Sequence, residues 1–467
     1  MLALELIDSG LVLARSAGQT SEVLADAPGV AILEENETIT GDEAAHRVRR
    51  SPLLAQTNFW RGLSTSPLAR PSRVAQTTAD IAFAQANALL GKLRDTEPRL
   101  LLALPGGYSR EQLGLLLGVI NETGVSVAGL VDSALAACSL EAAAPRVLHL
   151  DFEMHQAILT VLEYSGGDRA GLKRARYEIA PQHGLLAIHQ RWVEFIADTF
   201  VRKTRFDPLH DAANEQRLVD ELPDWLSQLA DRDRINVSMA VADRTPEIEL
   251  VRDDLVAAAQ SHYSEWLRLV QGARVAGMPI ELRVSHRIAA LPGLIDRFRG
   301  LRDCSVKVLP RGAAALGALQ HESAIARSAD ALALVYLLPS AALSEVNEQV
   351  GEFESTPAAL RPTHVLYQGR AWRISDHPLT LGWSAGVNKR QIALPSSLPG
   401  ISRSHCTLVR RNGSVLVEDH STYGSFVNDE RVQGRTALTV GDRLRVGTPG
   451  ITLDLIQMVD DHGAPQD

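Results

Sequence analysis

Residues 400–428 of this chain are GISRSHCTLVRRNGSVLVEDHSTYGSFVN, and this stretch decides the fold of the C-terminal part. Short apolar runs at 406–409 and 415–417 flank Asn412-Gly413, a dipeptide that strongly favours a two-residue hairpin turn. A Ser-Arg-Ser-His tetrad at 402–405 stands directly before the first run. The stretch therefore predicts a β-hairpin that follows a loop carrying the tetrad.

The two-residue period of β-strands extends on both sides of this hairpin. Residues 365–367 and 371–374 form another pair of short runs around Gln368-Gly369, and later apolar runs continue to about residue 458. Short runs separated by turn residues in this way are typical of all-β proteins. We therefore expect residues 363–458 to form an all-β module.

The order of the short motifs in this module is more specific than any one of them. In sequence they are LTLG at 379–382, IALP at 392–395, SRSH at 402–405, STYGSFVN at 421–428 and LTVGDRL at 438–444. This order resembles that of a forkhead-associated (FHA) domain, a β-sandwich whose loops bind phosphothreonine peptides. The resemblance implies that the chain binds protein partners, with phosphothreonine proteins among them if the phosphate site is kept.

The resemblance also implies roles for individual loop residues. Ser402 matches the serine that donates a hydrogen bond to phosphate, and Thr422 matches a threonine that often assists it. His405 matches a histidine that braces the loops from within, so we expect it to be structural, together with Gly382 and Gly424. The residues expected to bind a partner are Ser402, Arg403, Thr422, Trp383, Tyr423 and Asn428.

Two positions depart from the family pattern where phosphate and peptide are held. In the family, the glycine that ends the first strand is normally followed by an arginine, but here Gly382 is followed by Trp383. The residue before the later glycine is normally Asn, but here Tyr423 precedes Gly424. Loss of an arginine–phosphate pair removes about 1.5–3 kcal/mol, or about ten- to a hundredfold in affinity. Candidates for a replacement charge are Lys389, Arg390 and Arg403.

Three interpretations of the two aromatic residues stay open. The module is a weakened phosphopeptide binder, or it binds an unphosphorylated partner through an apolar surface of Trp383 and Tyr423, or both rings pack into the base of the loops. Exposed aromatic side chains on loops are typical of residues that dominate protein interfaces. We therefore favour the unphosphorylated partner.

Residues 1 to about 322 alternate short apolar runs with longer helical patterns, which indicates an α/β architecture. One predicted helix, 184–203, places large apolar side chains at helical spacing. We expect residues 323–362 to be a linker with one apolar segment at 331–338, because Ala, Ser, Glu and Pro are frequent there. The tail 459–467 is expected to fray.

Several tracts in the α/β part resemble the two-lobed actin-like ATPase fold, most closely the ATPase domain of the seventy-kilodalton heat-shock chaperones. LELIDSG at 4–10 matches the start of that family's first phosphate hairpin, and small-residue tracts at 130–137 and 311–317 match its two lobe-connecting helices. Such helices suit a hinge where two helices cross closely. The resemblance implies lobes at about 1–145 and 146–322 around a nucleotide cleft.

The glycine-rich hairpins that hold phosphate in this family are not kept. Three glycines should follow Asp151, but the sequence continues FEMHQ, and only a backbone without Cβ lets several N–H groups converge on phosphate. Glu153 would add about 3 kcal/mol of repulsion per unit charge at ~5 Å. The residues left in the cleft are Asp8, Gly10, Asp132, Asp151 and Gly312. We therefore expect no ATP hydrolysis, no cofactor and no metal.

The composition agrees with a soluble globular protein, at 45% hydrophobic and 22% charged residues. A net charge of -9 argues against nucleic acid as a partner. Three cysteines are too few and too far apart for a disulfide framework or a zinc signature. No stretch reaches the ~18 apolar residues of a membrane helix, and MLALELIDSG lacks the basic start of a signal peptide. We expect a cytoplasmic protein; the oligomeric state stays open.

The favoured hypothesis is a non-catalytic adaptor, in which a chaperone-like domain without phosphate loops is the scaffold and the FHA-like module docks a partner. In bacteria the resemblance also implies a setting in Ser/Thr kinase signalling or secretion assemblies. The alternative is a chaperone-like ATPase or ATP-gated switch that binds ATP with Mg²⁺ and is targeted by a phosphopeptide-binding FHA domain. A chaperone proper ranks third, because the substrate-binding β domain and helical lid are missing.

Overall fold

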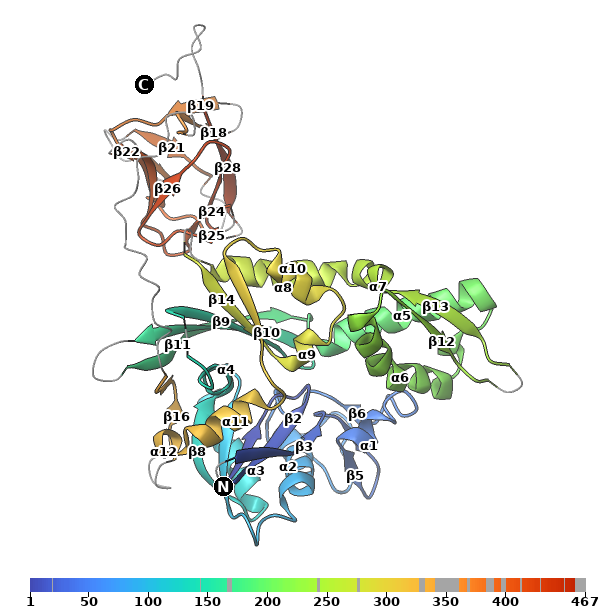
Figure 1. The fold of residues 1–467 in the computed structure, drawn as a ribbon. Coiled ribbons are helices and arrows are strands. Elements are labelled where there is room, and N and C mark those ends of the chain that lie inside the picture. Colours follow the sequence, from blue (N-terminus) through green and yellow to red (C-terminus); the bar gives the residue numbers. More distant parts are fainter. Residues whose placement is uncertain are drawn as a thin grey trace. The chain divides into compact units, whose positions relative to one another are not determined.

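The computed structural model describes residues 1–18, 20–142, 144–165, 170–241, 244–274, 278–326, 332–340, 361–367, 370–383, 390–395, 400–411, 414–428, 430–448 and 450–457. The chain divides into two compact units. The larger unit consists of Met1–Leu269 with Ile280–Ser344, and the smaller one of Val270–Pro279 with Glu345–Asp467. Figure 1 labels the helices and strands of each unit.

The first sheet of the larger unit has the strand order β16-β8-β7-β1-β2-β3. Its strands are β1 (Leu2–Glu5), β2 (Leu11–Ala17), β3 (Thr20–Ala27), β7 (Arg99–Leu104), β8 (Ser126–Asp132) and β16 (Leu334–Val335). β2 is antiparallel to both β1 and β3, whereas β7 is parallel to both β1 and β8. Parallel neighbours need crossover connections, and these contain helices α2 (Thr78–Leu90) and α3 (Arg110–Glu122).

Alternation along the strands gives this sheet two different faces. On one face, Leu102 and Leu104 belong to an apolar cluster that includes side chains of α2 and α3. On the other face, Ala103 belongs to a cluster with the small residues of α4 (Ser133–Cys138) and α11 (Ala313–Gln320). Helices therefore cover both faces, as the sequence pattern of an α/β protein predicts.

The second sheet has the strand order β15-β14-β9-β10-β11-β17. Its strands are β9 (Arg146–Phe152), β10 (Gln156–Ser165), β11 (Gly171–Pro181), β14 (Ile280–Val284), β15 (Cys304–Val308) and β17 (Leu337–Leu338). β10 is antiparallel to β9 and β11, whereas β14 is parallel to β9 and β15. The order β11-β10-β9-β14-β15 thus repeats the order β3-β2-β1-β7-β8. The parts built on the two sheets are called the first and the second lobe.

Helices α4 and α11 cross at very short distance. A Cβ atom built on Gly317 would lie 1.9 Å from the main-chain oxygen of Ala136, so a glycine is required at this crossing. Gly312 precedes α11 with a φ of 72°, and a Cβ built there would lie 2.8 Å from a methyl group of Val12. The small residues of these two segments predicted a close crossing, and the structure contains it.

The remaining elements of the larger unit surround the two sheets. The helices are α1 (Asp42–Ala45), α5 (Leu185–Thr204), η1 (Pro208–His210), α6 (Ala212–Asp231), α7 (Arg252–Ala258), α8 (Gln260–Ala273), α9 (His286–Ala289), α10 (Leu294–Arg299) and α12 (Glu322–Ile325). The strands are β4 (Ala31–Leu33), β5 (Thr38–Thr40), β6 (Ala55–Gln56), β12 (Arg234–Ser238) and β13 (Glu247–Val251).

Part of the segment 323–362, which the sequence suggested as a linker, belongs to the sheets instead. β16 pairs in parallel with β8, and β17 pairs antiparallel with β11, so residues 334–338 add a strand to each sheet. These residues are called the strap. Their apolar side chains explain the difference, since Leu338 is fully buried at the sheet edge. Residues 341–360 and the expected tail 459–467 lie outside the described residues.

Within 361–457, the described residues of the smaller unit form a β-sandwich with the strand orders β19-β18-β28-β27-β24-β25 and β21-β20-β22-β23-β26. The strands are β18 (His364–Tyr367), β19 (Arg370–Arg373), β20 (Leu379–Gly382), β21 (Gln391–Ala393), β22 (Cys406–Arg411), β23 (Ser414–Asp419), β24 (Ser425–Val427), β25 (Glu430–Arg431), β26 (Arg435–Leu438), β27 (Arg443–Val446) and β28 (Ile451–Ile456). Apolar side chains of both sheets share one core cluster, Leu408 and Leu444 among them. The predicted all-β sandwich is confirmed; the turns expected at Gln368-Gly369 and Asn412-Gly413 lie outside the described residues.

Candidate functional site

Two loops of the sandwich meet at Gly382, the last residue of β20. A Cβ atom built on this glycine would lie 2.1 Å from the main-chain oxygen of Arg403 and 3.0 Å from that of Ser402. Only a residue without a side chain lets the end of β20 come this close to the loop before β22. The backbone N–H of Trp383 then donates a hydrogen bond to the oxygen of Ser402 at 3.3 Å. Gly382 therefore sets Trp383 beside the tetrad loop.

His405 connects the loop before β22 with the loop before β24. Its side chain is fully buried, Nδ1 accepts a hydrogen bond from the backbone N–H of Ser402 at 3.0 Å, and Nε2 donates one to the oxygen of Gly424 at 3.0 Å. Burial lowers the pKa of His405. The ring is therefore neutral, which is the state in which one nitrogen accepts while the other donates.

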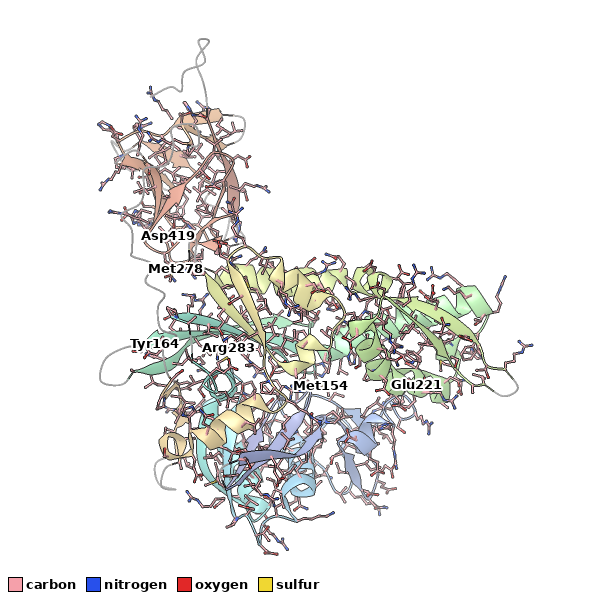
Figure 2. The ribbon with its side chains drawn as sticks, viewed as in Figure 1. Met154, Tyr164, Glu221, Met278, Arg283 and Asp419 are labelled. Atoms are coloured by element: carbon pink, nitrogen blue, oxygen red, sulfur yellow. The ribbon has the colours of Figure 1, made fainter. Side chains whose placement is uncertain are left out.

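Ser402 and Thr422 lie side by side at this junction. The hydroxyl oxygen of Ser402 accepts a hydrogen bond from the backbone N–H of Thr422 at 3.4 Å. The loop around Thr422 is ordered by Asp419, labelled in Figure 2, whose carboxylate accepts from the hydroxyl of Ser421 at 2.8 Å and from that of Ser425 at 2.9 Å. An aspartate two residues before a serine commonly orders a turn, and this local pattern is the signal that could have singled out Asp419.

Both aromatic replacements lie at the surface of the sandwich. The exposed fraction is 38% for Trp383 and 55% for Tyr423, so neither ring is packed away in the base of the loops. The guanidinium carbon of Arg403 lies 5.3 Å from the centre of the Trp383 ring, which is a cation–π contact. Of the other candidate cations, Arg390 is hydrogen-bonded to residues between β19 and β20, and Lys389 lies outside the described residues.

Asn428 is not part of this junction, although the sequence suggested it as a partner-binding residue. Its side-chain amide donates to Asp442 at 2.8 Å and accepts from the backbone N–H of Arg443 at 2.9 Å, so both ends are used inside the sandwich. A cation that the sequence did not single out, Arg431, lies next to Gly424 at the junction. A Cβ built on Gly424, which has a φ of 86°, would lie 2.9 Å from Nε of Arg431.

In the larger unit, Arg287 lies among the residues expected to line a nucleotide cleft. Its Nη1 is 3.0 Å from a carboxylate oxygen of Glu5 and 3.3 Å from one of Asp151, and its Nη2 donates to the main-chain oxygen of Gly10. Glu5 also accepts from the backbone N–H of Ala314 at 3.1 Å. One buried side chain of the second lobe therefore holds the first strand of the first lobe. Its partners lie far away in sequence, so the sequence pattern did not single it out.

The other two expected cleft carboxylates also have protein partners. Asp8 accepts a hydrogen bond from the backbone N–H of Met154 at 2.7 Å, across the two lobes. Burial, together with the nearby carboxylate of Glu153, raises the pKa of Asp8 to about 7. Asp132 caps α4 and lies 2.7 Å from Arg174. Within the described ranges, no three His, Cys, Asp or Glu side chains are grouped so that they could hold a metal ion.

Aromatic side chains fill the space between the β9–β10 hairpin and α8. The ring centres of Phe152 and Trp266 are 4.4 Å apart, and the indole N–H of Trp266 donates to the main-chain oxygen of His183 at 3.0 Å. Tyr263 packs beside Trp266 and donates its hydroxyl to the oxygen of Pro292 at 2.7 Å. Phe152, Tyr263 and Trp266 are all fully buried, which leaves little room for a ligand at this position.

Residues 379–447 match the family model of the FHA domain. The matched range contains Gly382, the tetrad at 402–405 and Gly424, so it includes the junction described above. FHA domains bind protein partners that contain phosphothreonine, and the match is consistent with protein partners for this domain. Comparison with curated proteins gives no match. In the part of the chain that the structure describes, no helix combines the length and the apolar character needed to cross a membrane.

Proposed function

We propose that this chain is a non-catalytic adaptor of the cytoplasm. Its FHA domain docks a protein partner, and its larger unit is a scaffold with a two-lobed, actin-like fold whose nucleotide site has been lost. The partner is recognised mainly through Trp383 and Tyr423, without a requirement for phosphate. Neither ATP, Mg²⁺ nor another cofactor takes part.

The observation that carries the binding function is the surface around the Ser402–Thr422 pair. Two large aromatic side chains are exposed there, and the guanidinium of Arg403 lies over one of them. Tyr, Trp and Arg are the residue types that most often dominate the energy of protein interfaces. Because two exposed aromatic rings dominate this surface and Arg403 is engaged with the ring of Trp383, which stands at the position of the missing arginine, the surface suits an apolar or aromatic peptide better than a phosphate group.

The fold of the scaffold is supported by its internal repeat. Both lobes have three antiparallel strands followed by two parallel ones, and small-residue helices α4 and α11 cross between them. This arrangement agrees with the two lobes and the hinge that the actin-like resemblance implies. The resemblance rests on the sequence tracts at 4–10, 130–137 and 311–317 together with this repeat.

The loss of the nucleotide site is supported by the position of Arg287. In the resembled family, hairpins after the first strand of each lobe hold phosphate, and here Arg287 bonds to Gly10 and Asp151 in those hairpins. A bound triphosphate would have to displace these buried bonds. Its charge would also meet Glu5 and Glu153, both buried carboxylates. We therefore expect isothermal titration calorimetry with ATP and Mg²⁺ to give no binding heat at millimolar nucleotide; a micromolar Kd would contradict this part of the proposal.

The binding function can be tested with the full chain, immobilised and exposed to cell lysate before and after phosphatase treatment. The same protein should be captured from both lysates. Trp383→Ala and Tyr423→Ala should each weaken its capture by about tenfold or more, because truncating a central aromatic costs about 2 kcal/mol. Tyr177→Ala, which truncates an exposed ring of the larger unit, is the control and should change nothing. Loss of capture after phosphatase, together with loss in Ser402→Ala, would instead establish a phosphopeptide binder.

A further inference from the structure

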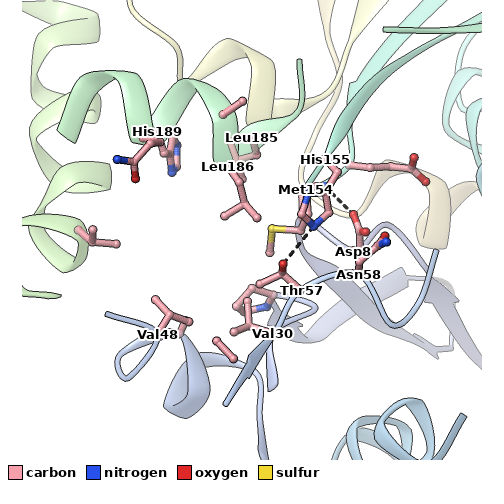
Figure 3. A pocket seen from close by; sticks show the side chains of 18 of the residues that line it. Asp8, Val30, Val48, Thr57, Asn58, Met154, His155, Leu185, Leu186 and His189 are labelled. Atoms are coloured by element: carbon pink, nitrogen blue, oxygen red, sulfur yellow. Dashed lines mark hydrogen bonds between the residues drawn. The ribbon is translucent and has the colours of Figure 1, made fainter. Parts of the chain in front are cut away.

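A cavity of about 940 Å³ lies between the two lobes of the larger unit, and Figure 3 shows it from close by. Val30 and Val48 of the first lobe line one wall, and Leu186 and Val193 on α5 line the wall opposite. Met154 also lines the cavity, and its backbone N–H donates a hydrogen bond to Asp8. Most of the surface that a ligand would touch is therefore aliphatic.

The size and lining of this cavity fit a small organic molecule. Ligand sites in proteins typically have volumes of roughly 300–1,000 Å³, and their walls are mostly apolar with a few polar groups. The site differs from the place where Arg287 is bonded, because neither Arg287 nor Gly10 lines the cavity. Residues of the two hairpins discussed above do reach the cavity, Asp8 and Ser9 from the first and residues 153–156 from the second, and they bring carboxylates and bulky side chains rather than the glycines that hold phosphate.

The charges around the cavity disfavour an anion. Arg49 lines it, but its guanidinium lies 3.1 Å from Glu215 and donates to Gln190 at 2.6 Å. Arg61 lies 3.7 Å from Glu153 and donates to the main-chain oxygen of Gly106 at 2.9 Å. Both arginines are thus engaged with protein groups, and the carboxyl groups of Asp8 and Glu153 also line the cavity. A ligand carboxylate or phosphate would meet these acidic groups, while the two lining arginines are already bonded to the protein.

One polar side chain in the apolar wall is available for a ligand. His189 lies on α5 beside Leu185 and Leu186 in Figure 3, and it has no hydrogen-bond partner among the described residues. Burial lowers the pKa of His189 to about 4, so its ring is neutral at physiological pH. A neutral imidazole offers one donor and one acceptor to a ligand in the cavity.

We propose that this cavity binds an uncharged small molecule with an apolar body and one hydroxyl or amide group, which hydrogen-bonds to His189. The aliphatic walls bury the body of the ligand, and the neutral histidine selects the polar group. This site would add a small-molecule ligand to the adaptor, and it does not depend on how the FHA domain recognises its partner.

Fluorescence titration of the full chain with N-phenyl-1-naphthylamine, an uncharged apolar dye, tests the site directly. The dye should bind saturably with one site per chain and a micromolar Kd. 1-Decanol should displace it, whereas decanoate and decylamine, which have the same chain with a charge, should be at least tenfold weaker. Equal displacement by decanoate, displacement by ATP, or absence of saturable binding would each overturn the proposal.

Two variants on α5 form a matched pair for the same titration. Leu186→Arg places a charge in the cavity and should weaken dye binding at least tenfold, whereas Val201→Arg changes an apolar residue of the same helix that is 40% exposed and does not line the cavity. Thermal denaturation establishes that both variants are folded. Equal loss of binding in both would contradict the assignment of the site.

A third variant isolates the polar contact. His189→Phe keeps an aromatic ring in the wall but removes the donor and the acceptor. Dye binding should persist, while the affinity for 1-decanol should fall about fivefold, which corresponds to one neutral hydrogen bond. An unchanged affinity for 1-decanol would mean that His189 does not bond to the ligand. The wild-type titration with decanoate and decylamine would still decide whether the cavity prefers uncharged ligands.

Discussion

Single side chains fix the loops of the FHA domain, and His405 does so with both ring nitrogens. We expect His405→Ala to lower the free energy of unfolding of this domain by roughly 2–5 kcal/mol, because the N–H of Ser402 and the oxygen of Gly424 each lose their partner. Amide hydrogen exchange of peptides from β22 and β24 measures this loss. His420→Ala is the control, since that ring is exposed and bonds to Thr407; a comparable effect there would refute the bracing role.

For single residues, the sequence predicts those whose roles depend on short motifs with fixed spacing. Gly382, Ser402, Thr422 and His405 could be singled out because family motifs have fixed local spacing. Arg287 could not, because its partner Glu5 is 282 positions away in the chain, and only the folded lobes bring the two together.

Asn428 illustrates a second limit of local spacing. It follows the other loop residues closely in sequence, and the motif therefore suggested a position on the binding surface. Its backbone φ of 50° instead turns the chain between β24 and β25, and its amide bonds to Asp442 and Arg443. Closeness in sequence did not imply a place at the junction of Ser402 and Thr422.

Among the secondary-structure elements, helices α4 and α11 cross so closely that position 317 requires glycine. Gly317→Ala should destabilise the larger unit by about 3 kcal/mol, because the new Cβ would lie against the main-chain oxygen of Ala136 and the helices must move apart. Thermal denaturation of the full chain measures the change.

Gly118 on α3 provides the matched control for this crossing. A Cβ built on it meets nothing within 4 Å, so Gly118→Ala should leave stability unchanged or raise it by up to ~1 kcal/mol through helix propensity. If the two glycine substitutions had similar effects, the close crossing would not be a constraint on the fold.

The helix expected at 184–203 is confirmed as α5, because its apolar periodicity extends over many residues. β16 and β17 could not be predicted, since each is two residues long and two residues carry no measurable period. Their membership in the sheets depends on the edges that β8 and β11 leave open, which only the assembled lobes define. The sequence pattern therefore predicts a linker where the structure has the strap.

For the larger unit as a whole, Asp8 makes stability depend on pH. Its pKa rises from an ordinary value of 3.8 to about 7 on folding, so the folded state binds the proton more tightly. The contribution of Asp8 to the free energy of unfolding should therefore be greatest below about pH 4 and should fall as the pH rises toward 7. Asp8→Asn keeps an acceptor for Met154, and we expect it to remove this slope.

The comparison is a series of melting temperatures between pH 4 and pH 8. Asp8→Asn should match the wild type near pH 4 and exceed it at pH 8, by roughly 2–4 kcal/mol in free energy. Glu122→Gln, which neutralises an exposed carboxylate on α3, should follow the wild-type curve. A parallel curve for Asp8→Asn would mean that this carboxylate does not control the pH response.

The strap has a mechanical consequence for the whole molecule. Tyr336 lies between β16 and β17, and Arg174 of the second lobe donates its backbone N–H to the oxygen of Tyr336 at 3.0 Å. Residues 334–338 thus pair with an edge strand of each sheet within five residues of chain, so the two lobes cannot separate at this edge without breaking one of the pairings.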